Sequence, residues 1–162
     1  MNRLAALIAV LMLWPELSVA QTDIAIGGLT ADPTAPIEVS ADSLSVDQAT
    51  GEAVFSGNVV IGQGAMRIAA ARVVVVYDEA SGEIVRLAAS GGVTFVTATE
   101  AAEAAEAVYD LTGQTLVLTG EVLLTQGASA ISADRMVIDL SAGTAQFEGR
   151  VRTVLTQGQA DN

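Results

Sequence analysis

The sequence predicts an all-β protein built from repeats of a strand–turn–strand unit, and three observations carry this prediction. The phrase TGEAVFSGNVVIGQG (50–64) returns 62 residues later as TGQTLVLTGEVLLTQG (112–127). The chain is 51% apolar but only 4% aromatic, which favours small β-forming side chains around a modest core. Glycines recur at spacings of 31, 31 and 30 residues, a period typical of repeat proteins, at Gly51, Gly82, Gly113 and Gly143.

The N-terminus has the pattern of a secretory signal peptide over residues 1–20. Arg3 precedes the apolar run LAALIAVLMLW, and the small residues Ser18 and Ala20 end the segment. A membrane span needs about twenty apolar residues, so this run is short for one. We therefore expect cleavage between Ala20 and Gln21 and export of the remaining chain. An uncleaved membrane anchor is the alternative.

The repeats predict one β domain over residues 37–157, after a flexible lead-in over 21–36 and before a polar tail over 158–162. The runs SLSVD (43–47), RVVVVY (72–77) and RMVIDL (135–140) are rich in β-branched residues and predict strands. Turns are predicted at DQATGE, DEASGE, DLTGQ and LSAGT. The glycine in each can adopt the left-handed conformation that a tight turn requires.

A second glycine lies inside the strand pattern of each copy, at Gly57, Gly92, Gly120 and Gly149. A glycine in this context marks a β-bulge or a sharp bend rather than a turn. The third copy has one more residue between its glycines than the first, which a bulge would tolerate. The segment EAAEAAEA (100–107) favours helix by propensity. It is short for a helix and falls in register with strands of other copies, so we predict a strand.

The composition excludes most catalytic chemistry, and we expect neither an enzyme nor a cofactor or metal site. The chain has no histidine, lysine or cysteine, so catalytic triads, Schiff bases, phosphate loops with lysine and zinc sites are absent. A net charge of −12 argues against nucleic acid as a partner. Asp42, Asp134 and Glu106 recur with the repeat, which favours a role at turns or edges.

The arginines of the mature chain are scattered, and each is expected to be a solvated side chain. The alternative is that some of them line a rim that contacts anions. They are Arg67, Arg72, Arg86, Arg135, Arg150 and Arg152.

Alternation along the strands predicts an inner face of medium-sized aliphatic side chains and phenylalanines. Phe55 shares a face with Val59 across Gly57, and Phe147 with Val151 repeats this pair across Gly149. These residues either pack into a dry core or leave a groove between two sheets, and the sequence leaves both readings open.

The quoted phrases resemble the LptA/OstA-like family of periplasmic lipopolysaccharide transport proteins. PIEVSADSLSVDQATGEAVFSGNVVIGQGAMRIAAARVVVVYD is similar to the opening of the family's domain, and AVYDLTGQTLVLTGEVLLTQG and ISADRMVIDL resemble later repeats. The resemblance extends over roughly residues 37–157. It implies an antiparallel β-jelly roll of two facing sheets, which form an open-ended trough with an apolar groove.

The resemblance further implies a periplasmic bridge protein that carries lipopolysaccharide from the inner to the outer membrane, with the acyl chains of lipid A in the groove. Its implied partners are inner- and outer-membrane components of the transport bridge, joined by edge-strand pairing, and further copies of the chain arranged head to tail. The positions expected to line the groove and bind lipid are Ile37, Val39, Phe55, Val59, Ile61, Val93, Phe95, Leu116, Leu118, Val122, Leu124, Met136, Ile138, Phe147 and Val151.

Two other functions compete with this reading. One is an LptC-like subunit of the same pathway, which would remain tethered to the membrane by its N-terminus. The other is a structural, self-assembling β-repeat protein with a dry core, which would polymerise through the same edges without binding lipid. No basic residue is assigned to the lipid A phosphates, because the chain has no lysine.

Overall fold

The structure, a computed structural model, describes residues 24–25, 29 and 32–156, and these form antiparallel β-strands joined by turns. The predicted signal peptide, its cleavage site and the polar tail lie outside the described residues. The strands are β1 (Ile24–Ala25), β2 (Ile37–Ser40), β3 (Ser43–Asp47), β4 (Glu52–Gln63), β5 (Met66–Tyr77), β6 (Ile84–Val96), β7 (Glu100–Asp110), β8 (Thr115–Gln126), β9 (Ser129–Asp139), β10 (Thr144–Glu148) and β11 (Arg152–Val154).

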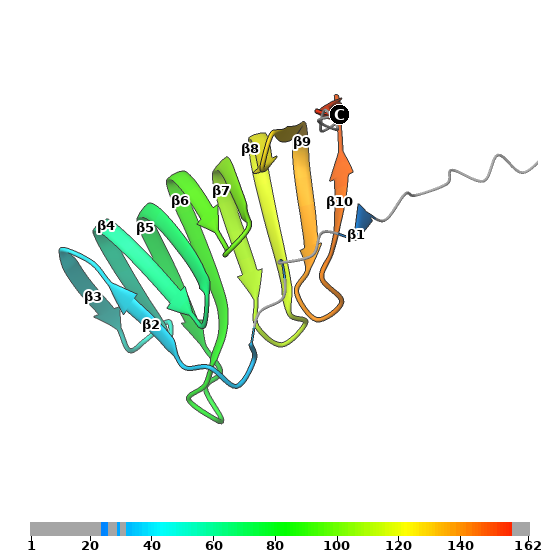
Figure 1. The fold of residues 1–162 in the computed structure, drawn as a ribbon. Coiled ribbons are helices and arrows are strands. Elements are labelled where there is room, and N and C mark those ends of the chain that lie inside the picture. The colour runs from blue at the N-terminus through cyan, green and yellow to red at the C-terminus, as the bar shows by residue number, and fades with distance from the viewer. Residues whose placement is uncertain (1–23, 26–28, 30–31, 157–162) are drawn as a thin grey trace, which may run out of the picture.

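All strands belong to one sheet in the order β1-β10-β9-β8-β7-β6-β5-β4-β2, with β11 also paired to β9 and β3 also paired to β4. The sheet advances strand by strand along the molecule and does not close into a barrel (Figure 1). The prediction of an all-β, repeat-built antiparallel jelly roll is confirmed. The segment 100–107 is strand β7, as its register predicts.

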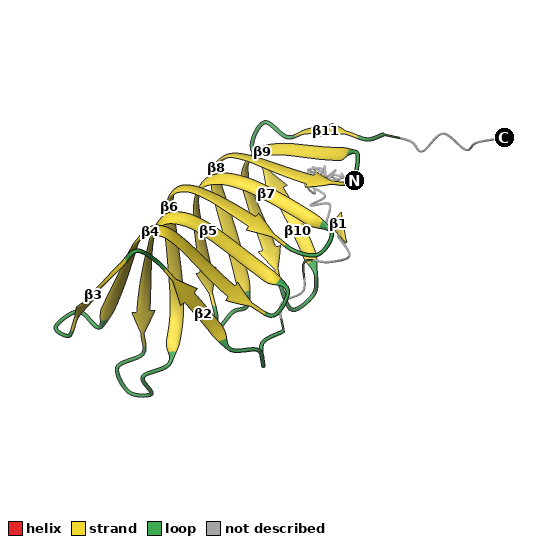
Figure 2. Ribbon diagram, turned by 60° about the vertical axis from the view of Figure 1, so that its left-hand side comes forward, coloured by secondary structure: helices red, strands yellow, loops and turns green. Residues whose placement is uncertain are grey.

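The two facing layers of the trough are the two halves of the same long strands, which bend near their middles (Figure 2). Pairing registers shift at these bends, for example between Ser56 and Val59 and between Ser90 and Val93. We call one side of the bends layer A; it contains β1, β3, β10 and residues 52–56, 72–77, 84–90, 106–110, 115–119 and 135–139. Layer B contains β2, β11 and residues 59–63, 66–70, 93–96, 100–104, 122–126 and 129–133.

The prediction that the second glycines mark bends is confirmed. Gly57, Gly92 and Gly120 lie at register shifts and have positive φ angles of 82°, 85° and 84°. The edge strand at one end of the sheet is interrupted at this same level, and so is the strand beside β9 near the other end, where β1 pairs with β10 as the outermost strand. β2 and β3 pair with the two halves of β4, and β11 and β10 pair with the two halves of β9.

The tripeptide Ser-Ala-Asp occurs twice, at residues 40–42 and 132–134, and both copies lie beside these interruptions. The backbone N–H of Asp42 donates to the carbonyl of Gly57 at 2.8 Å, and that of Asp134 donates to the carbonyl of Gly149 at 2.9 Å. The Asp42 carboxylate accepts a hydrogen bond from Asn58, and that of Asp134 accepts hydrogen bonds from Arg150. Arg150 holds the pKa of the Asp134 carboxyl below its ordinary value. Both aspartates therefore fasten a bend, whereas Glu106 lies exposed after the bend of β7.

The tight turns carry aspartates that accept hydrogen bonds from the turn backbone, at Asp47, Asp78, Asp110 and Asp139. The predicted left-handed glycine is found at Gly51, Gly82 and Gly143, but in the third turn Gln114 adopts it, with a φ of 49°. The residue that makes the distance between the two glycines of the third copy longer than in the first therefore belongs to the turn and not to a bulge. From the left-handed residue to the bend glycine the spacing is the same in Gly51–Gly57, Gln114–Gly120 and Gly143–Gly149.

Gln114→Gly is expected to raise the free energy of unfolding by about 0.5–1 kcal/mol. The left-handed conformation costs a residue with a side chain about 1–2 kcal/mol, and glycine avoids this cost. Glycine also loses more chain entropy on folding, which offsets part of the gain. Denaturant unfolding measures the change. The matched control is Gly113→Ala, where φ is not left-handed and a Cβ would make ordinary contacts at 3.6 Å. Equal destabilisation by both variants would contradict this assignment of the turn.

Candidate functional site

The space between the two layers is lined by cross-strand rows of apolar side chains that run the length of the sheet. In layer A the rows are Leu44, Phe55, Val73, Ala89, Ala107, Leu118, Met136 and Phe147, and, nearer the turns, Val46, Ala53, Val75, Leu87, Tyr109, Leu116, Ile138 and Ala145. In layer B the central row is Val39, Ile61, Ile68, Phe95, Ala102, Leu124 and Ile131. The rows form one continuous apolar interior.

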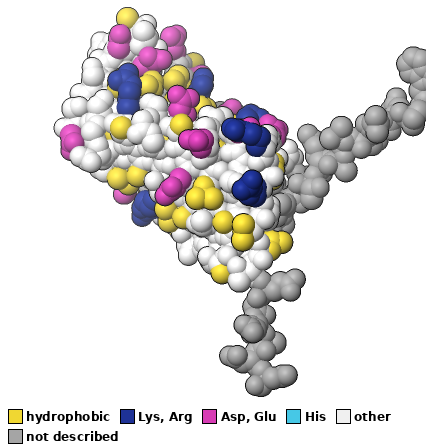
Figure 3. Space-filling model, turned by 90° about the horizontal axis from the view of Figure 1, so that it is seen from above, with side chains coloured by type: hydrophobic (Ala, Val, Ile, Leu, Met, Phe, Trp, Pro, Cys, Tyr) yellow, Lys and Arg dark blue, Asp and Glu magenta, His cyan; other side chains and the backbone are white. Residues whose placement is uncertain are grey.

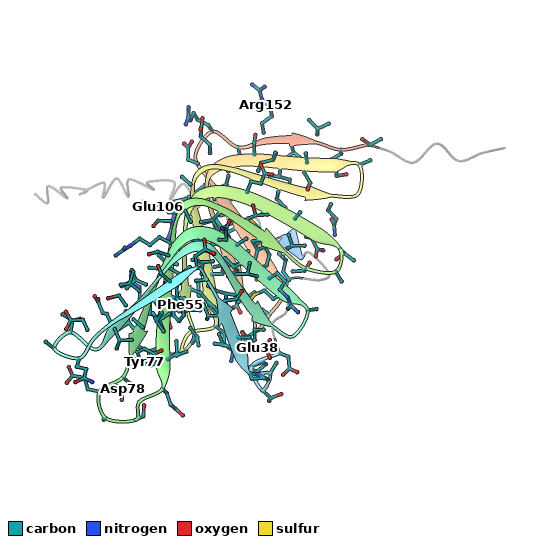
Figure 4. The ribbon with its side chains drawn as sticks, turned by 90° about the vertical axis from the view of Figure 1, so that its left-hand side faces the viewer. Glu38, Phe55, Tyr77, Asp78, Glu106 and Arg152 are labelled. Atoms are coloured by element: carbon teal, nitrogen blue, oxygen red, sulfur yellow. The ribbon has the colours of Figure 1, made fainter. Side chains whose placement is uncertain are left out.

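The interior is packed shut in this structure. Phe95, Leu118 and Met136 are fully buried at 0% exposure, and Ile61 and Val59 are 1% exposed. The backbone joins the two layers along the bends. The opposite side of the interior, where the turns lie, is called the turn side, and there side-chain contacts hold the layers together. In Figure 4, which looks along the trough, Phe55 lies between the two arms, while Glu106 and Arg152 point away from the interior.

The structure places the predicted lining positions as follows, and lipid binding at them stays a prediction. Every predicted groove position except Val151 lies in a described strand and faces the interior. Ile37, Val39, Phe55 and Phe147 are only partly buried because they lie at or near the ends of the sheet. Val151 lies in the connection before β11 and is 51% exposed. The same inner side of the edge strand β3 exposes Leu44 and Val46.

The predicted lining omits several inner residues, for different reasons. The run VVVV (73–76) has the same side chain on both faces, and only the pairing register places Val73 and Val75 inside. Leu29, in the expected lead-in, is fully buried in the core. Tyr109 was missed because it directly precedes a turn. The alternation of β7, which buries Ala107, would have indicated it.

A polar lip borders the interior on the turn side of layer B; we define it as Gln63, Thr97, Glu100 and Gln126. Gln63 and Glu100 are buried, with exposures of 4% and 2%. The Glu100 carboxylate accepts hydrogen bonds from the Thr97 hydroxyl at 2.5 Å and from the Gln126 amide at 3.0 Å. Among the described residues, no buried side-chain nitrogen or oxygen lacks a hydrogen-bond partner. The buried polar side chains of the lip are therefore all hydrogen-bonded.

Tyr109 extends from layer A to this lip. Its hydroxyl donates to Oε1 of Gln63 at 3.0 Å, and Nε2 of Gln63 donates to the carbonyl of Ala35 at 3.3 Å. Because the interior removes water from the phenol, the pKa of Tyr109 is raised above its ordinary value of 10.0. The hydroxyl consequently stays protonated and remains a donor at physiological pH.

Apart from the buried Glu100, the charged side chains of the described residues lie on the outer surface. Acidic and basic groups are scattered over the bend side, between hydrophobic and uncharged areas (Figure 3). Two arginines are paired, Arg135 with Glu148 at 2.7 Å and Arg150 with Asp134 at 2.5 Å, and Arg67 donates to backbone carbonyls at the turn after β4. Hollows on the outer side, of about 530 Å³ beside Gly57 and Gly92 and about 440 Å³ beside Arg150, follow the bends.

Within residues 24–25, 29 and 32–156, no group of three or more histidine, cysteine, aspartate or glutamate side chains could hold a metal ion. Within the same residues there is no helix long and apolar enough to span a membrane.

Comparison with known proteins places the chain among similar sequences and folds. Residues 38–144 match the model of a family described as LptA/(LptD N-terminal domain) LPS transport protein. An uncharacterised protein of Rhizobium meliloti (strain 1021) is 28% identical over 139 residues, which are 79% of this chain and 75% of that protein. The crystal structure of LptH from Pseudomonas aeruginosa, described as the LptA-homologous periplasmic component of the lipopolysaccharide transport device, superposes with a TM-score of 0.70. That match covers 78% of this chain and 99% of LptH at 21% identity.

Proposed function

This chain belongs to the LptA/(LptD N-terminal domain) family of lipopolysaccharide transport proteins, and from this premise we propose that it is a periplasmic lipid carrier. It holds the acyl chains of lipid A between layers A and B and takes part in moving lipopolysaccharide from the inner to the outer membrane. The observation that carries the proposal is the continuous apolar interior between two layers that the backbone joins along one side, in a sheet that does not close into a barrel. Each acyl methylene buried there contributes about 0.8 kcal/mol.

The packed interior implies that lipid enters by parting the layers on the turn side. Backbone continuity at the bends keeps the layers joined on the other side, so parting them leaves the strand pairing intact. Separation exposes inner side chains such as Phe95 and Leu118, and the acyl chains then cover the same surface. The exchange replaces protein–protein contacts by protein–lipid contacts of the same apolar kind.

The lipid A phosphates stay in water in this proposal, and the acyl chains supply the affinity. A chain with a net charge of −12 gains nothing from long-range attraction to an anionic head group. Arg135 and Arg150 already pair with carboxylates. Increasing ionic strength is thus expected to leave lipid affinity unchanged or to raise it.

The interrupted edges are the proposed joints of the bridge. Leu44 and Val46 on β3 are 56% and 62% exposed, and Val154 and Leu155 at the other end are 58% and 72% exposed. Edge strands with free backbone groups and exposed apolar side chains pair readily with another chain. The proposed occupants are further copies of this chain, head to tail, and the inner- and outer-membrane components of the pathway.

The structural β-repeat reading remains the second candidate, because the closed interior fits a dry core as well. Photo-crosslinking distinguishes the two. A photoreactive residue at position 95, where Phe95 is 0% exposed, is expected to form lipid adducts in cells that make lipopolysaccharide. The same residue at position 94 is the matched control, because the neighbouring Thr94 is exposed on the outer face and should give none. A folded, exported protein without adducts at position 95 would favour the structural reading.

A further inference from the structure

The bond between Tyr109 and Gln63 is unusual in this interior because it joins two polar groups across an otherwise apolar space. Tyr109 is on β7 in layer A, between Leu87 and Leu116, and Gln63 is at the end of β4 in layer B, between Ile37 and Met66. Both side chains face inward, with exposures of 3% and 4%. A chain that lies between the layers at this depth must therefore separate the two groups.

Separating these groups is costly unless the lipid replaces their bond. A buried donor or acceptor that loses its partner keeps the full penalty of its desolvation. Tyr109 would lose its acceptor, and Oε1 of Gln63 would lose its donor, while Nε2 of Gln63 retains the Ala35 carbonyl. A plain hydrocarbon chain offers no replacement. A hydroxyl on the chain can accept from Tyr109 and donate to Gln63.

We propose that Tyr109 and Gln63 form an exchange site, at which a hydroxyl group on the acyl chain replaces their mutual hydrogen bond. This inference rests on the proposed function. In the empty protein their mutual hydrogen bond holds the two layers together on the turn side. In the loaded protein both groups bond to the lipid hydroxyl instead. The pair thus selects hydroxylated acyl chains over plain ones of the same length, and it is a specificity determinant of the groove rather than part of its apolar lining.

The location of the pair supports this assignment. Gln63 belongs to the polar lip, whose other members, Glu100, Thr97 and Gln126, bond to one another and have no partner in layer A among the hydrogen bonds described. Tyr109 is the polar member of the inner rows of layer A, all of whose other side chains are apolar. The exchange site is consequently where the apolar interior meets the polar lip, near the side on which the layers can part.

The first test compares two ligands on the wild-type protein. β-Hydroxymyristic acid and myristic acid have the same chain length and the same carboxylate. The ratio of their dissociation constants therefore measures the contribution of the hydroxyl group to binding. Displacement of a fluorescent acyl probe measures both. We expect the hydroxylated acid to bind about three- to tenfold more tightly, the effect of one net hydrogen bond.

The second test alters the pair. Tyr109→Phe removes the bond that plain chains must break, so the affinity for myristic acid should rise about three- to tenfold. The double variant Tyr109→Phe/Gln63→Met replaces both polar partners by apolar groups of similar size, which preserves the fold. Its preference for the hydroxylated acid should be lost or reversed. Tyr77→Phe is the matched control, because no hydrogen bond of the Tyr77 hydroxyl is found in the described part of the chain, and it should change neither affinity.

The outcomes separate this inference from the function on which it rests. Binding of both acids with equal affinity, unaltered in Tyr109→Phe and in the double variant, would overturn the exchange site and leave the lipid carrier standing. Failure of the wild-type protein to bind either acid or lipid A would overturn the proposed function and the exchange site with it.

Discussion

Gly91→Ala is expected to lower the free energy of unfolding by about 2–5 kcal/mol, the sum of backbone strain and overpacking. The φ of Gly91 is 83°, and an added Cβ would lie 2.7 Å from the Cβ of Ala71 on the neighbouring strand. Real Cβ atoms do not approach so closely, so β5 and β6 must move apart at the bend. Because Val93 and Phe95 follow this bend, lipid binding should weaken together with stability.

Gly92 supplies a control that differs in one respect. Its φ is 85°, but an added Cβ would meet nothing within 4 Å. Gly92→Ala therefore carries the strain alone, about 1–2 kcal/mol. Ala71→Gly in the Gly91→Ala background should restore most of the difference between the two single variants, because it removes the clashing atom. Denaturant unfolding of the four proteins measures each step. Equal losses at positions 91 and 92 would show that close packing does not fix the bend.

Lysines on the inner side of β3 are expected to disrupt assembly. Leu44→Lys/Val46→Lys places two charges on the exposed inner side of an edge strand, where a neighbouring copy would bury them. Charge at an edge is a common means by which proteins prevent strand pairing. We expect the association constant of the proposed head-to-tail complex to fall at least about tenfold, the effect of about 1.4 kcal/mol, while the monomer stays folded.

The control for this prediction lies between the two positions. Ser45 is exposed on the outer side of the same strand, so Ser45→Lys adds a charge at the same edge without entering the apolar contact. Sedimentation velocity over a range of concentrations gives the association of each variant. If the double variant associates as the wild type does, β3 is not the joint, and the opposite edge of the sheet, formed by β1 and β11, should be tested in its place.

The sequence predicted the fold well because the features that define it are local. An aspartate and a left-handed residue, which is glycine in three cases and Gln114 in the other, define the turns that begin at Asp47, Asp78, Asp110 and Asp139, and the second glycine marks the bend. The period of the repeat placed strand β7 correctly despite the helical propensity of EAAEAAEA. In the third turn the left-handed residue is Gln114 instead of Gly113, and its spacing to the bend glycine matches that of the first and fourth turns.

The groove was only partly predictable. Alternation identified Phe95, Leu118 and Met136 as inner residues, but in the run from Val73 to Val76 both faces carry the same side chain. Whether small inner residues leave a groove or pack together depends on how closely two layers approach, and no local pattern encodes that distance. The packing of the layers answers it: the interior is closed in this structure and must part to admit a ligand.

By itself the sequence therefore determined the strands, the turns, the bends and the apolar character of the inner face, since each follows from residues near one another in the chain. Only the tertiary structure decided which residues meet across the interior. Tyr109 and Gln63 are 46 residues apart and on different layers, and Leu29 reaches the core from outside the repeats. Such contacts arise from the bend and twist of the whole sheet, which add up over many strands and are set by no single segment.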